Sequence, residues 1–205
     1  MPDVSGAAVG SSGLLSFTER GSGPYSAEHL ASDLARLLDH LAVDSTAVLG
    51  YSQGGAIAQQ LALDHPTRCE RLVLACTYAF NMATVREKVE GHLVPLLLDA
   101  LGMRRFARLI IAQGLKHVDQ DRAEWITGLI GSQDRRAMVA AWREAMAFDS
   151  RHRLAEIRCS TLVVAASKDQ GVPLHHARML HQRVAGSRLV IVQGADHALI
   201  WERSD

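Results

Sequence analysis

The chain has 205 residues, 48% of them hydrophobic, and its 22 basic and 22 acidic residues cancel to a formal net charge of zero. This length supplies a sizeable core and indicates one domain, with room for an insertion. A chain without net charge has no overall field to attract nucleic acid or an anionic membrane surface, so neither is an expected partner. Every apolar run is broken well before about 18 residues, which predicts no membrane-spanning helix.

The N-terminal residues and the cysteines indicate the compartment. Residues 1–13 carry Asp3 where a secretory signal has basic residues, and they lack a continuous apolar stretch. We expect them to be disordered and the protein to be cytoplasmic. Cys69, Cys76 and Cys159 are odd in number and lack metal-ligand spacing, which predicts reduced packing thiols rather than disulfides or a zinc site.

Helices and strands are expected to alternate in the first part of the chain. Leucines at helical spacing after Ser26, an N-cap residue type, predict an amphipathic helix to about Leu41. The further elements expected before residue 77 are a buried strand at 47–49, a helix at 54–64 that stops at Pro66, and a buried strand at 71–76. This alternation predicts a parallel sheet.

From about residue 78 to residue 151 the pattern predicts helices without strands, including helices at 94–111 and 135–148. Their apolar stripes could pack as core, but a helical segment over the ligand end of a sheet can also line a pocket. We interpret this segment as a cap. Strands are expected again at 161–165 and 188–192, with a helix at about 174–184 between them.

The segment Gly50-Tyr51-Ser52-Gln53-Gly54 follows an apolar strand and leads into a helix of small residues. In this context Gly-x-Ser-x-Gly forms a sharp turn that lifts the serine hydroxyl above the sheet. Bulk two positions away on either side would obstruct the turn, so we expect both glycines to be required. The following helix directs free N–H groups and its positive dipole end at the site where negative charge would develop. Ser52 is the candidate nucleophile.

A serine hydroxyl needs a base to take its proton, and the base needs an acid to orient it. Asp169 and His197 each lie in a loop just after a late strand, and loops at the carboxyl ends of parallel strands converge at one edge of the sheet. Asp196 is the alternative acid, although a residue rarely points at the ring of its immediate neighbour. His175 and His176 fall at a helix start, where a solvated or packing role is sufficient.

Strand, Gly-x-Ser-x-Gly turn and helix, followed by Asp and then His, resemble the α/β-hydrolase fold. The sequence around these motifs is similar to that of small cap-bearing carboxylesterases, enol-lactonases and cofactor-free haloperoxidases, and the resemblance covers roughly residues 14–205. The resemblance implies an α/β fold with a mostly parallel sheet flanked by helices. Its core would comprise residues 1–77 and 152–205, and a helical cap would comprise residues 78–151.

The resemblance also implies the role of each site residue. Ser52 would attack the acyl carbon, His197 would take and return the proton, and Asp169 would orient the imidazole and stabilise its charged form. The backbone N–H of Gln53 would be the first oxyanion donor, and no metal or organic cofactor is expected. The residues expected to contact the substrate are Tyr51, Phe106 and Trp142.

The chain departs from the family pattern before the serine turn. It lacks a His-Gly loop for the second oxyanion N–H, and residues 14–18 with the Arg-Gly-x-Gly turn at 20–23 resemble the strand and turn that follow that loop. The first strands therefore look deleted, and residues 201–205 look like the start of a closing helix. We expect the strand at 47–49 to present an unpaired edge unless residues 14–18 fill it, with a dimeric or aggregated state and weak esterase activity.

The function predicted from these residues is hydrolysis of a small carboxylic ester or lactone through an acyl-enzyme. The same triad can pass the acyl group to peroxide or to an alcohol, so a perhydrolase (haloperoxidase) or an acyltransferase is the alternative within the enzymes. The alternative to an enzyme is a non-catalytic binder, or an inactive fragment without a complete oxyanion hole.

Overall fold

A computed structural model describes residues 25–114 and 118–202. The expectations for residues 1–13 and for a strand at 14–18 lie outside the described residues. Within these described residues the sheet has four strands in the order β1-β2-β3-β4, and each neighbouring pair is parallel, as predicted. The strands are β1 (Thr46–Tyr51), β2 (Cys69–Ala75), β3 (Ser160–Ala166) and β4 (Arg188–Val192).

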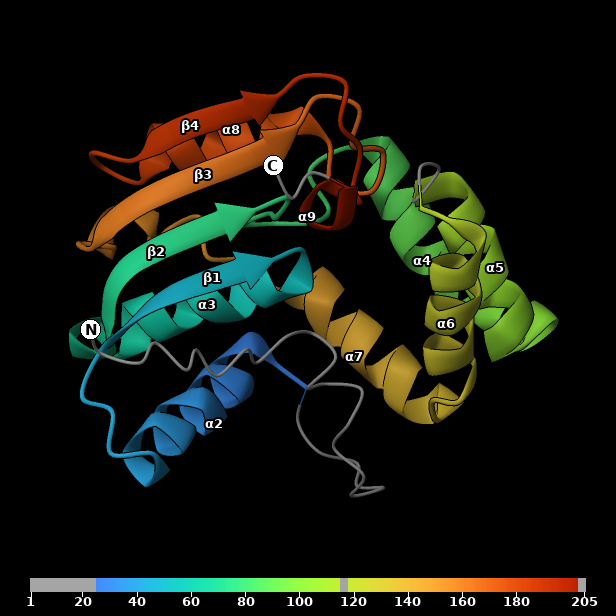
Figure 1. The fold of residues 1–205 in the computed structure, drawn as a ribbon, viewed down its shortest axis with the longest axis horizontal. Helices are drawn as coiled ribbons and strands as arrows, with labels where there is room; N and C mark the ends of the chain where they lie inside the picture. The colour runs from blue at the N-terminus through green and yellow to red at the C-terminus, as the bar shows by residue number, and fades with distance from the viewer. Residues whose placement is uncertain (1–24, 115–117, 203–205) are drawn as a thin grey trace.

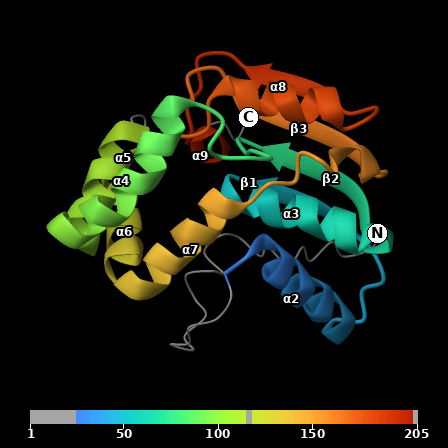
Figure 2. The same cartoon turned by 180° about the vertical axis from the view of Figure 1, so that it is seen from behind.

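One face of this sheet is covered by helices that follow its strands. The helices α3 (Gln53–Asp64) and α8 (Leu174–Arg183) lie behind the sheet in Figure 1 and in front of it in Figure 2. Apolar side chains of α3, α8 and the strands form the main core, including Ala58, Leu74, Val163 and Leu180. The helix α2 (Ala27–His40) packs on α3 through Ala31, Ala35 and Leu61. Its N-cap is Ser26, whose hydroxyl accepts a hydrogen bond from the His29 N–H, as the sequence predicts.

In chain order, the described residues between β2 and β3 form four helices, and Figure 1 shows them beyond the ends of the strand arrows. They are α4 (Val85–Leu101), α5 (Met103–Gly114), α6 (Gln120–Gly131) and α7 (Arg135–Ala147). The prediction of one helix at 94–111 is wrong, because Gly102 has a φ of 72° and ends α4 before α5 begins. The start of α4 also lies nine residues earlier, where Thr84 and Glu87 form a capping box.

The remaining short elements are 3-10 turns at Pro66–Arg68 and Leu154–Glu156 and the helix α9 (Leu199–Glu202). Pro66 follows the end of α3, as predicted.

The strand β1 lies at the edge of the described sheet. Within residues 25–114 and 118–202 it pairs with β2 alone, and the side chain of Leu49 is 60% exposed. No helix in this part of the chain is long and apolar enough to cross a membrane.

Candidate active site

Ser52 lies in the tight turn between β1 and α3. Its backbone has φ 51° and ψ −124°, a region that residues other than glycine rarely occupy. Such a conformation persists only when the surroundings hold it, and both its neighbouring strand and loop do so. The Ser52 N–H donates to the carbonyl of Ala75 at 3.0 Å, and the Thr77 hydroxyl donates to the Ser52 carbonyl at 2.6 Å. The end of β2 therefore anchors the turn that presents Ser52.

The glycines around Ser52 differ in how closely they are packed. A Cβ on Gly50 would lie 2.6 Å from the Gly54 carbonyl oxygen, so the predicted need for glycine there is confirmed. A Cβ on Gly54 would meet nothing within 4 Å, so the steric reason given for that glycine is wrong. The tight position is Gly55 instead, where a Cβ would lie 2.3 Å from the Thr77 hydroxyl oxygen.

Ser52, His197 and Asp169 form a continuous chain of polar contacts at the carboxyl edge of the sheet. The Oγ of Ser52 lies 3.1 Å from Nε2 of His197, and Nδ1 of His197 lies 2.8 Å from Oδ2 of Asp169. Both are hydrogen-bonding distances, and they leave each ring nitrogen with a different partner. The fold thus brings together three residues that are up to 145 positions apart.

The carboxylate of Asp169 is held by its own loop. Its Oδ1 accepts hydrogen bonds from the N–H groups of Gly171 at 2.9 Å and Val172 at 2.8 Å, and its side chain is 1% exposed. Oδ2 is left to face the imidazole of His197. Asp196 caps a turn instead, because its Oδ1 accepts from the Ala198 N–H at 2.8 Å.

Tyr51 contacts the backbone of the candidate base. Its hydroxyl donates to the carbonyl oxygen of His197, and the two ring centroids lie 5.1 Å apart. This contact ties the end of β1 to the loop after β4 and braces His197 from the side of β1.

Cys76 is a neighbour of the site that the sequence reasoning assigned to packing alone. It follows β2 directly with a φ of 46°, and its thiol lies within 4.8 Å of the polar atoms of Asp169 and His197. Burial and the nearby Asp169 carboxylate raise the pKa of the Cys76 thiol to about 12, so the thiol is uncharged at neutral pH. The sequence signal for this proximity is the position of Cys76 directly after a strand, since the loops that follow parallel strands meet at the edge where the site lies.

The other predicted site residues occupy defined places. Gln53 is the first residue of α3, where a backbone N–H has no acceptor within the helix. Phe106 is buried on α5, and the indole N–H of Trp142 on α7 donates to the Gly91 carbonyl of α4 at 2.8 Å. A surface groove on α4 is lined by Val85, Lys88, Val89, His92, Leu93 and Leu96.

Comparisons with known proteins agree with this arrangement. Residues 1–108 match the family model of the alpha/beta hydrolase fold, and residues 131–205 match that of TAP-like proteins. The chain is 30% identical to the "Putative carbamate hydrolase RutD" of Azorhizobium caulinodans, over 86% of this chain and 68% of that protein. It is 31% identical to a poly(3-hydroxyalkanoate) depolymerase of Ectopseudomonas oleovorans, over 86% of this chain and 63% of that protein.

A solved structure gives the same result for the fold. The crystal structure of a hydrolase from Pseudomonas aeruginosa PA01 matches with a TM-score of 0.75 and 29% identity, covering 88% of this chain and 68% of that one. The chain therefore belongs to the α/β-hydrolase fold family. It spans about two thirds of the length of these relatives, and less than two thirds of the depolymerase.

Proposed function

We propose that this protein is a serine hydrolase that cleaves a carboxylic ester or lactone through an acyl-enzyme. The observation that carries the proposal is the contact chain from Ser52 Oγ through His197 to Asp169, with separations of 3.1 and 2.8 Å. A hydroxyl within reach of a ring nitrogen, whose other nitrogen faces a carboxylate, is the arrangement that activates serine for acyl transfer.

In the first half of the proposed reaction, Ser52 Oγ attacks the acyl carbon while its proton passes to Nε2 of His197. The carbonyl oxygen gains negative charge, which the Gln53 N–H at the start of α3 stabilises. The carbon–oxygen bond to the alcohol then breaks, and His197 returns the proton to the leaving oxygen. Asp169 stabilises the charged imidazole during this step.

In the second half, water attacks the acyl-enzyme, His197 takes the water proton, and the proton passes to Ser52 Oγ as the acid leaves. Two arrangements favour this cycle over a passive binding role. The Asp169 carboxylate is oriented by two backbone N–H groups, and Ser52 is held in a strained turn anchored by Thr77.

The substrate would enter between the carboxyl edge of the sheet and the four helices α4 to α7, which we assign as a cap over residues 78–151. Tyr51, Phe106 and Trp142 are the proposed apolar contacts, and small uncharged acyl groups are the proposed substrates. The names of the two relatives suggest an ester or a carbamate. An ester and a carbamate ester both present a carbonyl carbon with an alcohol oxygen as leaving group, so the same steps apply to these two.

The experiment is hydrolysis of p-nitrophenyl acetate, butyrate and octanoate by the purified chain. Ser52→Ala should abolish turnover, whereas Ser32→Ala, which changes a partly exposed serine of α2, should leave it unchanged. Phe106→Ala should alter the ratio of kcat/KM between the three esters. Turnover that survives in Ser52→Ala, in a sample free of contaminating esterase, would refute the proposal.

Addition of peroxide or an alcohol to the same assay separates the alternative acyl acceptors. A perhydrolase or an acyltransferase would divert most of the acyl group from water to the added acceptor. We expect water to remain the main acceptor.

A further inference from the structure

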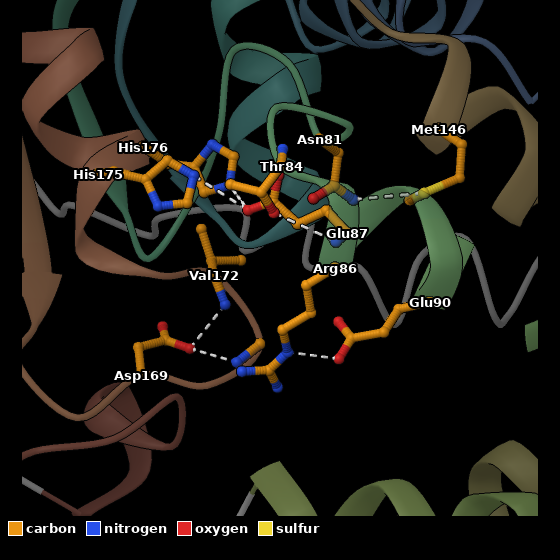
Figure 3. A network of polar contacts seen from close by, with 11 residues as sticks. Asn81, Thr84, Arg86, Glu87, Glu90, Met146, Asp169, Val172, His175 and His176 are labelled. Atoms are coloured by element: carbon orange, nitrogen blue, oxygen red, sulfur yellow. Dashed lines mark hydrogen bonds and ion pairs between the residues drawn. The ribbon is translucent and has the colours of Figure 1, made fainter. Parts of the chain in front are cut away.

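A cluster of Glu87, His175 and His176 lies between α4 and the first turn of α8, and none of the three belongs to the contact chain of Ser52, His197 and Asp169. Oε1 of Glu87 on α4 lies 3.0 Å from Nε2 of His175 and 3.0 Å from Nε2 of His176, both on the first turn of α8. Figure 3 shows the two imidazoles side by side with the carboxylate against them, and their ring centroids lie 4.1 Å apart. Three polar atoms therefore converge within 4.8 Å of one another.

The cluster is mostly removed from solvent. The side chain of His176 is fully buried, that of Glu87 is 9% exposed, and only His175 has an outer edge in water, with 39% exposed. Nε2 of His175 is itself buried, and among the described residues it has no hydrogen-bond partner despite its distance from Glu87. A buried ring nitrogen thus points into the cluster without forming a hydrogen bond there.

The charge state of the cluster suits a cation. Burial and the adjacent His175 lower the pKa of His176, so this imidazole is neutral at pH 7. Burial opposes ionisation of Glu87, but the Thr84 N–H and the imidazoles outweigh it and lower the pKa of the carboxyl. Metal coordination needs an ionised carboxylate and imidazoles with a free ring nitrogen, and the directions of the Glu87 and His176 pKa shifts agree with the geometry of the cluster.

We propose that Glu87 Oε1, His175 Nε2 and His176 Nε2 bind one divalent transition-metal ion of the zinc type. Zinc bonds of about 2.0–2.2 Å in tetrahedral geometry place neighbouring ligand atoms about 3.3–3.5 Å apart. The two separations of 3.0 Å reach that range with shifts of a few tenths of an ångström. Two imidazoles and one carboxylate select zinc-type ions over magnesium or calcium, which prefer oxygen ligands.

The surroundings orient the carboxylate for this role. The second oxygen of Glu87, Oε2, accepts a hydrogen bond from the Thr84 N–H at 2.8 Å as part of the capping box of α4. Partners of this kind fix the direction of a metal ligand. Three protein ligands leave a fourth tetrahedral position for water.

An ion at this site would join α4 to α8 and brace the loop that holds the candidate acid. The segment from Asp169 to the start of α8 is short, and the Val172 N–H in it donates to Asp169, as Figure 3 shows. The inference does not depend on the proposed hydrolysis, because its ligands are separate from Ser52 and His197.

The test uses the protein stripped with a chelator and then titrated with Zn²⁺ by calorimetry and with Co²⁺ by visible absorption. We expect one equivalent of Zn²⁺, the intense bands of tetrahedral Co²⁺, and a melting temperature that rises with the concentration of free Zn²⁺. His175→Ala should weaken Zn²⁺ binding at least about 10-fold, the smallest loss typical of changes around a metal site. The control is His181→Ala on the exposed side of α8, which should bind as the wild type does.

His176 is fully buried and its replacement could prevent folding, so Glu87→Gln provides the second test. This variant keeps an oxygen and a hydrogen-bonding side chain but loses the charge, and we expect it to lose the metal-dependent rise in melting temperature. Absence of a 1:1 Zn²⁺ complex in the wild type would overturn the proposal. Equal Zn²⁺ affinity in the wild type and His175→Ala would overturn it too, and the cluster would then be a hydrogen-bonded clamp only.

Discussion

The two glycines of the Gly-x-Ser-x-Gly turn are expected to respond oppositely to the same substitution. In Gly50→Ala the new methyl group would lie 2.6 Å from the Gly54 carbonyl oxygen, 2.6 Å from the Gly55 Cα and 2.7 Å from the Ala58 Cβ. Two of these three atoms belong to the backbone, so rotation of a side chain cannot relieve the contact. In Gly54→Ala the methyl group would meet nothing within 4 Å.

The size of each effect follows from these contacts. Overpacking lowers the free energy of unfolding by about 1–3 kcal/mol. Because backbone atoms cannot move aside as a side chain can, we expect a loss of about 3 kcal/mol for Gly50→Ala. One kcal/mol shifts the melting temperature of a chain of this size by about 2–4 °C, so Gly50→Ala should melt about 6–12 °C lower. Gly54 lies inside α3, where alanine stabilises a helix by about 0.5–1 kcal/mol, which predicts a rise of about 1–4 °C.

The assay is thermal unfolding of the wild type and both variants, followed by circular dichroism under identical conditions. Gly54→Ala is the matched control, because it adds the same methyl group four residues away on the other side of Ser52. Equal melting temperatures for the two variants, or a lower one for Gly54→Ala, would refute the packing described for this turn.

Three other predictions concern the acid, a helix cap and the dependence on pH. Asp169→Asn should lower kcat by on the order of 10⁴-fold, as in serine proteases, and Asp196→Asn should have a mild effect; the reverse order in ester hydrolysis would identify Asp196 as the acid. Thr84→Ala removes the N-cap of α4 and should cost about 1 kcal/mol, or about 2–4 °C in melting temperature by calorimetry; no change would mean that α4 begins elsewhere. Burial lowers the pKa of His176, which faces His175, Glu87 and Asp169. Below about pH 6.5 the unfolded chain therefore binds a proton that the folded chain does not, and the free energy of unfolding decreases as the pH is lowered. Urea titrations of the wild type at pH 7 and pH 5.5 should show this loss, and an equal free energy of unfolding at the two pH values would contradict it.

Much of the core could be predicted from local pattern. Short apolar runs between turn residues predict all four strands of the described part of the sheet, and for β4 the predicted bounds, residues 188–192, are those of the structure. The meeting of Ser52, Asp169 and His197 followed from one topological fact, that loops after parallel strands share an edge. The distances within the site agree with that reasoning, although the roles of these residues are proposals.

The predictions differ from the structure at helix ends and at positions whose packing depends on residues far away in the sequence. Apolar periodicity continues across Gly102, but its left-handed backbone ends α4. The Thr84-x-x-Glu87 pattern is the sequence signature of a capping box, and it marks the start of α4. The tight packing of Gly55 depends on Thr77 across the sheet, and the cluster of Glu87 with His175 joins residues 88 positions apart. Neither contact has a signature in the sequence near either residue.

The central claim, that Ser52 is a nucleophile activated by His197, is tested most directly by covalent labelling with a fluorophosphonate. This reagent reacts with a serine whose hydroxyl is activated by a base, and mass spectrometry of the digested protein locates the adduct. We predict one adduct, on Ser52, which is lost in Ser52→Ala and strongly reduced in His197→Ala. An adduct on another serine, or undiminished labelling in Ser52→Ala, would contradict the account.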